Sequence, residues 1–341
     1  MNKSRRITIK DIAAEMDVAS STVSKALTNQ PGVSEATRQE IIETARRMGY
    51  KVNKLARSLA RTPIRIGIVL PSVWSDFYAP IRKGLERCAN RYLDYNVSVL
   101  FEEFPSLYSG VGINKAIDHL IQEKVDAVIL SPASVTDLPE SLDRLSSKKI
   151  PLVLLGTDLE GSNRVCCVRI DADKAGRLSA EFLCLISPEN SKIAVFVGAR
   201  DMKDHREKAQ GFERELGTTT HKILGIFETQ DEPEIAYHLT QKLLKERDEL
   251  RSIYVATGNS ASVCRAIQEN GMQGKISVVG TDVTDEIVGF MQRGLIRAVV
   301  FQNPEKIGEL GLQVVVDMLL DRKTAPAEIL VKPQIMLKNS L

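Results

Sequence analysis

Two helical patterns separated by a tight turn near the N-terminus constrain this chain more than any other feature. Thr8 is a good helix cap, and Asp11 three residues later completes a capping-box pattern before an apolar run. A second helix is expected from Ser20, which leaves only a short turn at residues 16–18. Apolar residues recur at helical spacing in both segments, so the helices are expected to share a small core. The stretch 8–27 therefore predicts a helix-turn-helix.

A third helix and a basic segment follow this motif. Ser34 is placed to cap the third helix and Gly49 to end it. Residues 51–63 are basic and weakly amphipathic, and we interpret them as a hinge helix or linker. Residues 1–61 hold twelve Lys/Arg against six Asp/Glu, whereas the rest of the chain holds 34 against 38. A basic N-terminal segment on a slightly acidic remainder favours contacts with DNA phosphates. The charge alone would also fit a basic tail exposed to solvent.

Length and composition bound the remaining choices. A chain of 341 residues with 43% hydrophobic content is expected to form two or three folding units. It shows neither an apolar signal region nor an apolar run of membrane-spanning length, so we expect a cytoplasmic protein with no membrane partner. Five cysteines without C-x-x-C spacing predict reduced, mostly buried thiols. We interpret Cys166 and Cys167 as strand neighbours on opposite faces, with redox sensing as the alternative.

From Ile64 onward, short apolar runs alternate with helical segments in two successive series. This repeat predicts an α/β core of two doubly wound parallel-sheet lobes with a cleft between them. The expected strands are 65–70, 97–101, 127–130 and 152–155 in the first series and 165–169, 193–197, 223–227, 252–255 and 276–279 in the second. The expected helices are 78–93, 113–123 and 137–147, then 174–186, 205–216, 234–245, 260–270 and 285–293.

The ordered pattern T-x-x-D-[IV]-A, T-V-S-[RK], V-S-x-x-T-R, G-Y and N-x-x-A-x-x-L is matched along residues 8–59. In these motifs the segment 7–60 resembles the DNA-binding headpiece of the LacI/GalR family of bacterial repressors. The resemblance implies base reading by the start of the second helix and a leucine wedge in the minor groove. Three positions depart from the family: Asp17 for the turn glycine, Ala19 for the capping serine and Val52 for a proline. The implied DNA-binding residues are Thr8, Ser20, Ser21, Thr22, Ser24, Lys25, Asn53, Ala56 and Leu59.

The rest of the chain resembles, more loosely, the periplasmic-binding-protein-like core (type I) of the same regulators. The pieces that carry this resemblance are Ile66-Gly-Ile-Val, Asp76-Phe-Tyr, His205-x-x-Lys-x-x-Gly-Phe, Val279-Gly-Thr-Asp and Gln302-x-Pro. The resemblance implies three crossings between lobes, near residues 164, 300 and 328. The expected domains are a headpiece at 1–50, a hinge at 51–63 and a core at 64–341, with lobe 1 at about 64–163 and 301–327 and lobe 2 at about 164–300 and 328–341.

Polar and aromatic side chains that follow the predicted strands mark a candidate effector site. In open parallel α/β sheets a ligand lies beyond the carboxyl ends of the strands. Carboxylates, amides and aromatic faces suit a polyhydroxylated ring, so a sugar or sugar alcohol is expected. The candidates are Asp76, Phe77, Tyr78, Asp158, His205, Arg206, Lys208, Asn259, Asp282 and Gln302.

Each candidate has a structural alternative. Phe77 and Tyr78 could belong to the core, and Asn259 and Asp282 could cap the helices that follow them. The resemblance favours binding, because Phe77, Asn259, Asp282 and Gln302 match ligand-contacting positions in the sugar-binding relatives. Lys208 stands where the family often has an arginine, and the segment 156–158 lacks the usual Asp-Arg. These departures put a plain pentose or hexose specificity in doubt.

No sequence motif supports an enzyme. The chain has no G-x-x-x-x-G-K-[ST] loop, no G-x-G-x-x-G after its first strand and no G-x-S-x-G, and its four histidines lack metal-ligand spacing. We therefore expect no catalytic residue, metal or cofactor. A solute-binding protein or a doubly wound enzyme is disfavoured.

The resemblance implies a bacterial, homodimeric repressor that binds a pseudo-palindromic double-stranded operator, is associated with the nucleoid when bound, and is relieved by a sugar or polyol. A corepressor-type regulator that responds to a purine or phosphorylated metabolite is the alternative. The helix after Pro304 and the helix from Tyr78 are candidate dimer surfaces, or ordinary lobe packing.

Overall fold

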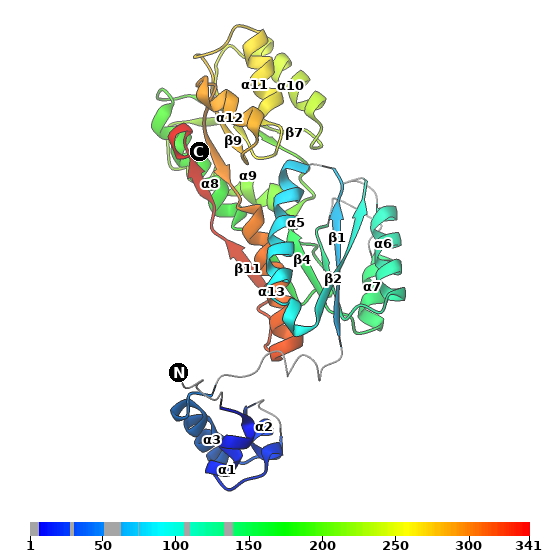
Figure 1. The fold of residues 1–341 in the computed structure, drawn as a ribbon. Coiled ribbons are helices and arrows are strands. Elements are labelled where there is room, and N and C mark those ends of the chain that lie inside the picture. The colour runs from blue at the N-terminus through cyan, green and yellow to red at the C-terminus, as the bar shows by residue number, and fades with distance from the viewer. Residues whose placement is uncertain (1–6, 28–30, 51–62, 74, 106–109, 133–138) are drawn as a thin grey trace. The chain divides into compact units, whose positions relative to one another are not determined.

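The computed structural model describes residues 7–27, 31–50, 63–73, 75–105, 110–132 and 139–341 (Figure 1). The chain divides into two compact units, Met1–Arg61 and Thr62–Leu341. Apart from Pro63, the expected hinge at 51–63 lies outside the described residues, and so do Asn53, Ala56 and Leu59.

The first unit contains the predicted helix-turn-helix and its third helix, α1 (Ile9–Glu15), α2 (Ser20–Leu27) and α3 (Glu35–Arg47). Thr8 and Asp11 form the expected capping box at α1, and the Ser34 side chain caps α3. Asp17 adopts a left-handed φ of 51° in the turn, where the Asp side chain is tolerated better than most. The small core at the centre of the three helices contains Ile12, Ala13, Val23, Ala26, Ile41 and Ala45.

The first lobe of the second unit is a six-stranded parallel sheet in the order β11-β5-β4-β3-β1-β2. One face carries α5 (Ser75–Asn90) and α13 (Pro304–Asp321), and the other carries α6 (Gly110–Gln122) and α7 (Pro139–Ser147) (Figure 1). The three neighbouring strands β3, β4 and β5 are almost entirely buried, as a parallel sheet covered on both faces requires. They are β1 (Ile64–Pro71), β2 (Val97–Phe104), β3 (Ala127–Leu130), β4 (Leu152–Gly156), β5 (Cys166–Ile170) and β11 (Glu328–Val331).

The second lobe repeats this plan with the order β12-β10-β9-β8-β6-β7, in which only β12 is antiparallel. One face packs against α8 (Ala172–Ile186) and α9 (Lys203–Leu216), and the other against the remaining three helices. Those are α10 (Pro233–Glu246), α11 (Ser260–Glu269) and α12 (Asp285–Gln292). The strands are β6 (Lys192–Val197), β7 (Lys222–Glu228), β8 (Leu250–Val255), β9 (Ser277–Thr281), β10 (Ile296–Phe301) and β12 (Gln334–Met336).

The chain crosses between the lobes later than expected at two of the three places. β5 pairs with β4, so the first crossing follows Ile170 instead of lying near residue 164. β11 pairs with β5, so the last crossing lies between Val331 and Gln334 instead of near 328. The middle crossing follows Phe301, close to the expected position. The two displaced strands extend the first-lobe sheet to six strands.

Each lobe contains a pair of helices that approach each other through glycines. A Cβ on Gly84 of α5 would lie 2.0 Å from the Glu305 carbonyl oxygen of α13, and one on Gly308 of α13 would lie 2.1 Å from that of Ile81. In the second lobe, Gly176 of α8 and Gly211 of α9 make equally close approaches to the facing backbone. These helix pairs therefore require glycine at the crossing points.

Apolar residues of α13 fill the first-lobe core. Ile307, Leu312 and the run 314–316 are buried there, so these side chains serve lobe packing and not a dimer surface. Cys166 and Cys167 lie on opposite faces of β5, in two different clusters, and all five cysteines are free. Burial raises the pKa of the Cys166 thiol to about 11, which disfavours the reactive thiolate. The interpretation of the pair as strand neighbours is confirmed.

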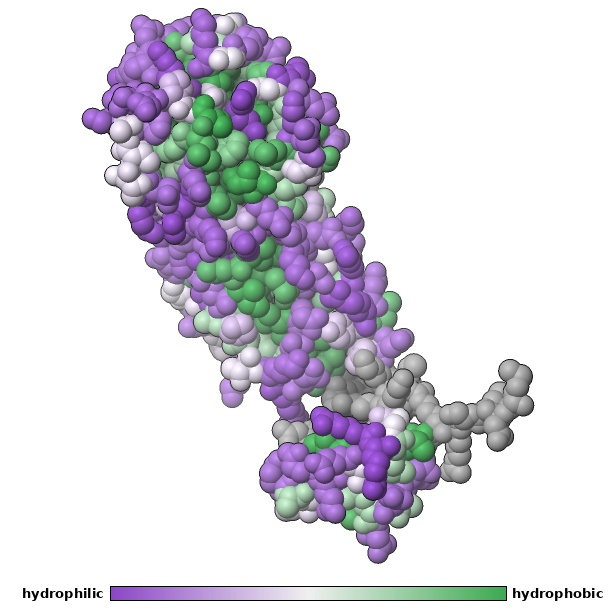
Figure 2. Space-filling model, turned by 90° about the vertical axis from the view of Figure 1, so that its left-hand side faces the viewer, coloured by the Kyte–Doolittle hydropathy of each residue, from purple (hydrophilic) through white to green (hydrophobic). Residues whose placement is uncertain are grey.

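Hydrophobic residues also reach the surface of the larger unit. Figure 2 shows two hydrophobic areas on one face, separated by a hydrophilic band. Leu185 of α8 is 79% exposed, and Leu330 and Leu337 are each nearly half exposed. Among the helices that the structure describes, none is long and apolar enough to cross a membrane.

Candidate functional site

The outer surface of α2 carries the predicted base-reading residues. Ser20, Ser21 and Lys25 are exposed, whereas Thr22 and Ser24 are half-buried. The opposite side of the helix is anchored by Val23 and Ala26 in the small core. A short helix with one buried side and an exposed row of hydroxyl and amino groups can enter a DNA major groove.

Polar contacts of α3 with α2 and with α1 hold the three helices of the first unit together. The Arg38 guanidinium of α3 donates to the Ala26 carbonyl at 3.2 Å, at the C-terminal end of α2. Arg47 of α3 pairs with Glu15 of α1 at 3.1 Å. Thr8 is exposed, and its hydroxyl donates to the Asp11 carboxylate at 2.7 Å. The side chain of Thr8 is thus engaged at the helix cap.

A cavity of about 90 Å³ lies between the two lobes of the second unit. The first turn of α5 and the ends of β3 and β4 line it from the first lobe, and α9 and the ends of β7 to β10 line it from the second. This is the strand-end position that the fold rule predicts. Six predicted effector residues meet here: Phe77, Tyr78, His205, Lys208, Asp282 and Gln302.

Asp282 has the most unusual surroundings in this cavity. Its backbone is left-handed, with φ 66°, and both carboxylate oxygens accept from the Gln302 amide at 3.0 and 2.9 Å. Thr284 caps α12, so Asp282 does not serve as the cap. Burial, together with the nearby Asp204 charge, raises the pKa of Asp282 to about 6, although Lys208 and Gln302 favour the charged form.

Asp204, His205 and Lys208 project from the first turns of α9. The Lys208 ammonium is buried, donates to the Ala256 carbonyl at 3.3 Å and lies 3.6 Å from the Asp204 carboxylate. Burial works against the charged form of Asp204, but His205 and Lys208 keep its pKa below the usual range. His205 Nδ1 accepts from the Ala199 amide at 3.1 Å, which fixes the ring orientation.

Two polar atoms of the cavity lining have no hydrogen-bond partner among the described residues. They are Asp204 Oδ1 and Thr157 Oγ1, and both residues are less than 10% exposed. Buried polar atoms are normally paired, so such atoms indicate a place for a ligand or water.

Asp76 and Asn259 line a neighbouring hollow of about 160 Å³ that shares Phe77 and Asp282 with the cavity. The Asn259 amide donates to Thr229 at 3.1 Å, and its carbonyl oxygen has no partner in the described part of the chain. Asn259 stands at the N-cap of α11 but makes no capping bond. The alternative capping role is therefore not observed.

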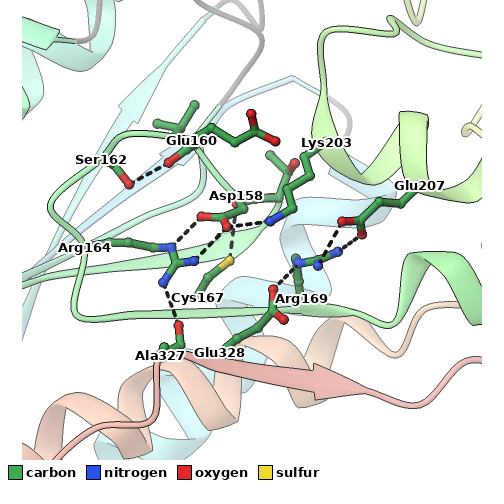
Figure 3. A network of polar contacts seen from close by, with 12 residues as sticks. Asp158, Glu160, Ser162, Arg164, Cys167, Arg169, Lys203, Glu207, Ala327 and Glu328 are labelled. Atoms are coloured by element: carbon green, nitrogen blue, oxygen red, sulfur yellow. Dashed lines mark hydrogen bonds and ion pairs between the residues drawn. The ribbon is translucent and has the colours of Figure 1, made fainter.

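Asp158 and Arg206 lie outside the cavity and form ion pairs between the lobes. Asp158, at the end of β4, accepts from Arg164 at 2.7 Å and from Lys203 of α9 at 3.1 Å (Figure 3). Arg206 of α9 pairs with Glu160 at 2.7 Å. Both charged groups are thus paired with protein residues outside the cavity, and the assignment of Asp158 and Arg206 to the effector site stays a prediction.

A second ion-pair set continues this contact. Arg169 of β5 is buried and bridges Glu207 of α9 and Glu328 of β11 (Figure 3). We call Asp158, Arg164, Lys203, Arg169, Glu207 and Glu328 the interlobe network. It fixes α9 of the second lobe against the first.

Sequence reasoning missed Asp204 and Asp231 of the cavity. Asp231 follows β7, so the strand-end rule would have selected it had it been applied to that strand. Asp204 lies on α9, one residue before the predicted His205. This neighbourhood was the only sequence signal that could have marked Asp204 as a cavity residue.

Family comparisons identify both units. Residues 8–53 match the family described as bacterial regulatory proteins, lacI family, and residues 66–323 match the periplasmic binding protein domain. Catabolite control protein A of Streptococcus mutans is 30% identical over 251 residues, which cover 72% of this chain and 71% of that protein. The chain belongs to the lacI family of bacterial regulatory proteins.

Two further relatives of this lacI-family regulator span more of its length. Catabolite control protein A of Priestia megaterium is 27% identical over 82% of this chain and 83% of its own. The probable HTH-type transcriptional repressor ExuR of Bacillus subtilis is 27% identical over 98% of both chains. The protein is thus a DNA-binding transcriptional regulator, and its relatives are not enzymes.

Solved structures show the same fold in the core of the lacI-family chain. The glucose-galactose binding protein GanP of Geobacillus stearothermophilus has a TM-score of 0.74 at 19% identity, covering 82% of this chain and 99% of its own. A solute-binding protein of Bacillus halodurans with bound myo-inositol has a TM-score of 0.72 at 16% identity, covering 82% and 96%. The predicted family and fold class are confirmed.

The described residues contain no group of three or more His, Cys, Asp or Glu side chains arranged to hold a metal ion. The cavity lining offers a ligand carboxylates, the Gln302 amide, one ammonium and two aromatic rings.

Proposed function

We propose that this regulator is a homodimeric repressor of a pseudo-palindromic operator, and that a small hydroxylated molecule in the interlobe cavity relieves repression. The observation that carries the proposal is the pairing of an exposed reading helix with a cavity lined by both lobes. A ligand that contacts both lobes favours one arrangement of them, and ligand and operator affinities are then thermodynamically coupled. Residues 51–63 are the proposed hinge, and Asn53, Ala56 and Leu59 the proposed minor-groove contacts.

The bound molecule is proposed to be a sugar or polyol. Hydroxyl groups can donate to Asp204, Asp231 and Asp282, while Phe77 and Tyr78 offer apolar ring surface. Two structural relatives are named for glucose-galactose binding and for bound myo-inositol, which agrees with this class.

Dimerisation is proposed through the larger unit. Its two hydrophobic areas (Figure 2) and the exposed Leu185, Leu330 and Leu337 supply apolar surface of the kind that subunit contacts cover. A repressor of this kind would act in the cytoplasm and be associated with the nucleoid when bound to its operator.

The test begins with selection of tight-binding duplexes from a random pool, followed by fluorescence anisotropy with the full chain. Lys25→Ala should weaken binding to the selected duplex by about tenfold or more, because Lys25 belongs to the reading helix. Lys10→Ala is the matched control, since it removes the same charge from an exposed position on α1. Equal losses in the two variants would contradict the assignment of α2 as the reading helix.

Effector coupling is tested on the same duplex with a panel of sugars, polyols, sugar phosphates and purines. A sugar or polyol that weakens operator binding, and loses this effect in Asp282→Ala, supports the proposal. A purine or phosphorylated metabolite that strengthens operator binding would replace it with the corepressor alternative. Sedimentation of the full chain with and without the duplex measures the oligomeric state, and a monomer on DNA would refute the dimer.

A further inference from the structure

The cavity carries more negative than positive charge. Asp204, Asp231 and Asp282 line it. Among its described lining residues, Lys208 is the one lysine, and there is no arginine. His205 is the remaining titratable base. An anion that entered would meet three carboxylates in a partly desolvated space, where charge interactions are stronger than in water.

Lys208 does not balance all of these charges. Its ammonium lies 3.6 Å from Asp204, so that pair is largely neutral. Asp282 accepts from the neutral Gln302 amide, and no ion pair within 4.0 Å connects it to any other described residue, although the Lys208 charge acts on it from farther away. A buried carboxylate without a directly paired cation is unfavourable, and a cation that binds it relieves that cost. With a pKa of about 6, this carboxylate is still mostly ionised at neutral pH.

Aromatic rings border the same space. Phe77 and Tyr78 lie edge to face with ring centroids 5.2 Å apart, and both line the cavity. The face of an aromatic ring attracts a cation, most strongly in a desolvated site. A ring face that is turned toward the cavity would add to the attraction of the carboxylates for an ammonium group.

The unpaired polar atoms near the cavity are oxygens that can accept hydrogen bonds from a ligand. Asp204 Oδ1 lacks a partner among the described residues and can only accept while Asp204 is ionised. Asn259 offers a carbonyl oxygen, likewise unpaired within the described chain, in the adjoining hollow. A ligand that brings several O–H and N–H groups satisfies them, whereas a carboxylate or phosphate brings further acceptors.

We propose that the effector is a small hydroxylated amine, cationic at neutral pH, whose ammonium group binds Asp282 while its hydroxyls bind Asp204 and Asn259. The cavity volume of about 90 Å³ favours a compact molecule over a nucleotide. This inference rests on the proposed function, because it specifies the class of the molecule that relieves repression.

The test compares pairs of probes that differ in one charged group. Tris(hydroxymethyl)aminomethane is paired with pentaerythritol, glucosamine with glucose, and galactosamine with galactose, with glucuronate as the anionic probe. Calorimetric titration of the full chain in phosphate buffer gives the affinities. We expect an amine to bind at least about tenfold more tightly than its neutral partner, since a charge-assisted hydrogen bond replaces a neutral one.

Two variants assign this preference to a residue. Asp282→Asn keeps the shape and tolerates the left-handed backbone, so it should bring the affinities of the two members of a pair together. Asp143→Asn is the control, because it removes an exposed carboxylate of α7 that does not line the cavity. The preference for the amine should persist in Asp143→Asn.

The remaining outcomes overturn the inference. They are equal or tighter binding of the neutral member, tighter binding of glucuronate, a preference that survives in Asp282→Asn, and no binding of any probe. If a neutral sugar bound and weakened operator affinity while the amines did not, the inference of an amine effector would fail and the proposed function would stand. If no member of the wider effector panel changed operator affinity, the proposed function would fail as well.

Discussion

Asp158 and Asp282 are both largely enclosed carboxylates between the same two lobes, yet their surroundings are opposite. Asp158 binds Arg164 and Lys203 in the interlobe network, and these cations keep its pKa at about 2 despite its burial. Asp282 is hydrogen-bonded to the Gln302 amide and feels the Lys208 charge only from beyond ion-pair distance, and burial raises its pKa to about 6. Burial acts in the same direction on both, so the neighbouring cations account for the difference. The carboxylate of Asp158 is ion-paired with cations of both lobes, whereas that of Asp282 lines the cavity without a direct ion pair to a described residue.

The largest expected effect follows from breaking the paired carboxylate. Asp158→Asn leaves Arg164 and Lys203 without their shared anion, and should lower the free energy of unfolding at pH 7 by about 2–4 kcal/mol. Urea unfolding followed by circular dichroism measures this loss. Unchanged stability would mean that the interlobe network does not hold the lobes, and the contrast with Asp282 would disappear.

An intermediate effect of opposite sign is expected from the unpaired carboxylate. The folded-state pKa of Asp282 lies above its unfolded value of about 3.9, so its ionisation costs stability as pH rises from about 4 to 6. Asp282→Asn should therefore stabilise the protein at pH 8 by roughly 1–3 kcal/mol. The gain should fade below pH 6 and vanish near pH 4. Thermal unfolding at these pH values measures it, and destabilisation at pH 8 would contradict the comparison.

The pH dependence of Asp158→Asn sharpens the same contrast. The folded-state pKa of Asp158 lies below its unfolded value, so its contribution is present above about pH 4 and is lost as pH falls toward 2. The stability difference between wild type and variant should be constant from pH 8 to 5 and shrink by about 1 kcal/mol at pH 3. A difference that is unchanged at pH 3 would show that packing, and not charge, sets the effect.

The smallest effect is expected at the exposed interlobe pair. Arg206 and Glu160 are 36% and 69% exposed, so Glu160→Gln should change the free energy of unfolding by no more than about 0.5–1 kcal/mol. The change should also shrink further in 1 M salt, because exposed pairs are screened. A loss as large as that of Asp158→Asn would show that burial is not what separates strong from weak interlobe pairs.

Local signals made the first unit predictable. The cap at Thr8, the left-handed turn at Asp17 and the end of α3 near Gly49 depend on neighbours within a few residues. The same holds for the alternation of strands and helices in the core. The sequence predicted residues 165–169 and the segment after 328 to lie in the second lobe, whereas β5 and β11 join the first-lobe sheet. These strands have no local feature that separates them from strands of the other lobe.

The sequence predicted that the site lies at the carboxyl ends of the strands, but not which residues there are ion-paired. The strand-end rule selected Asp158 and Asp282 alike, since both follow a buried strand. It could not show that Lys203, 45 residues away in sequence, would reach Asp158 and remove it from the cavity. Partners of buried charges are set by tertiary packing, so only the structure shows which strand-end carboxylates are ion-paired.

The placement of α13 and β11 in the first lobe bears on how the protein is made. A ribosome has produced β1 to β5 long before residues 304–331 emerge, so the first-lobe core lacks a helix and an edge strand until late in synthesis. The second lobe, lying between these parts in sequence, has five of its six strands available earlier. The three helices of the first unit, at residues 9–47, are released before either lobe, and domains fold as units in the order of synthesis. A nascent chain can thus present its DNA-binding unit before the part that would regulate it is complete.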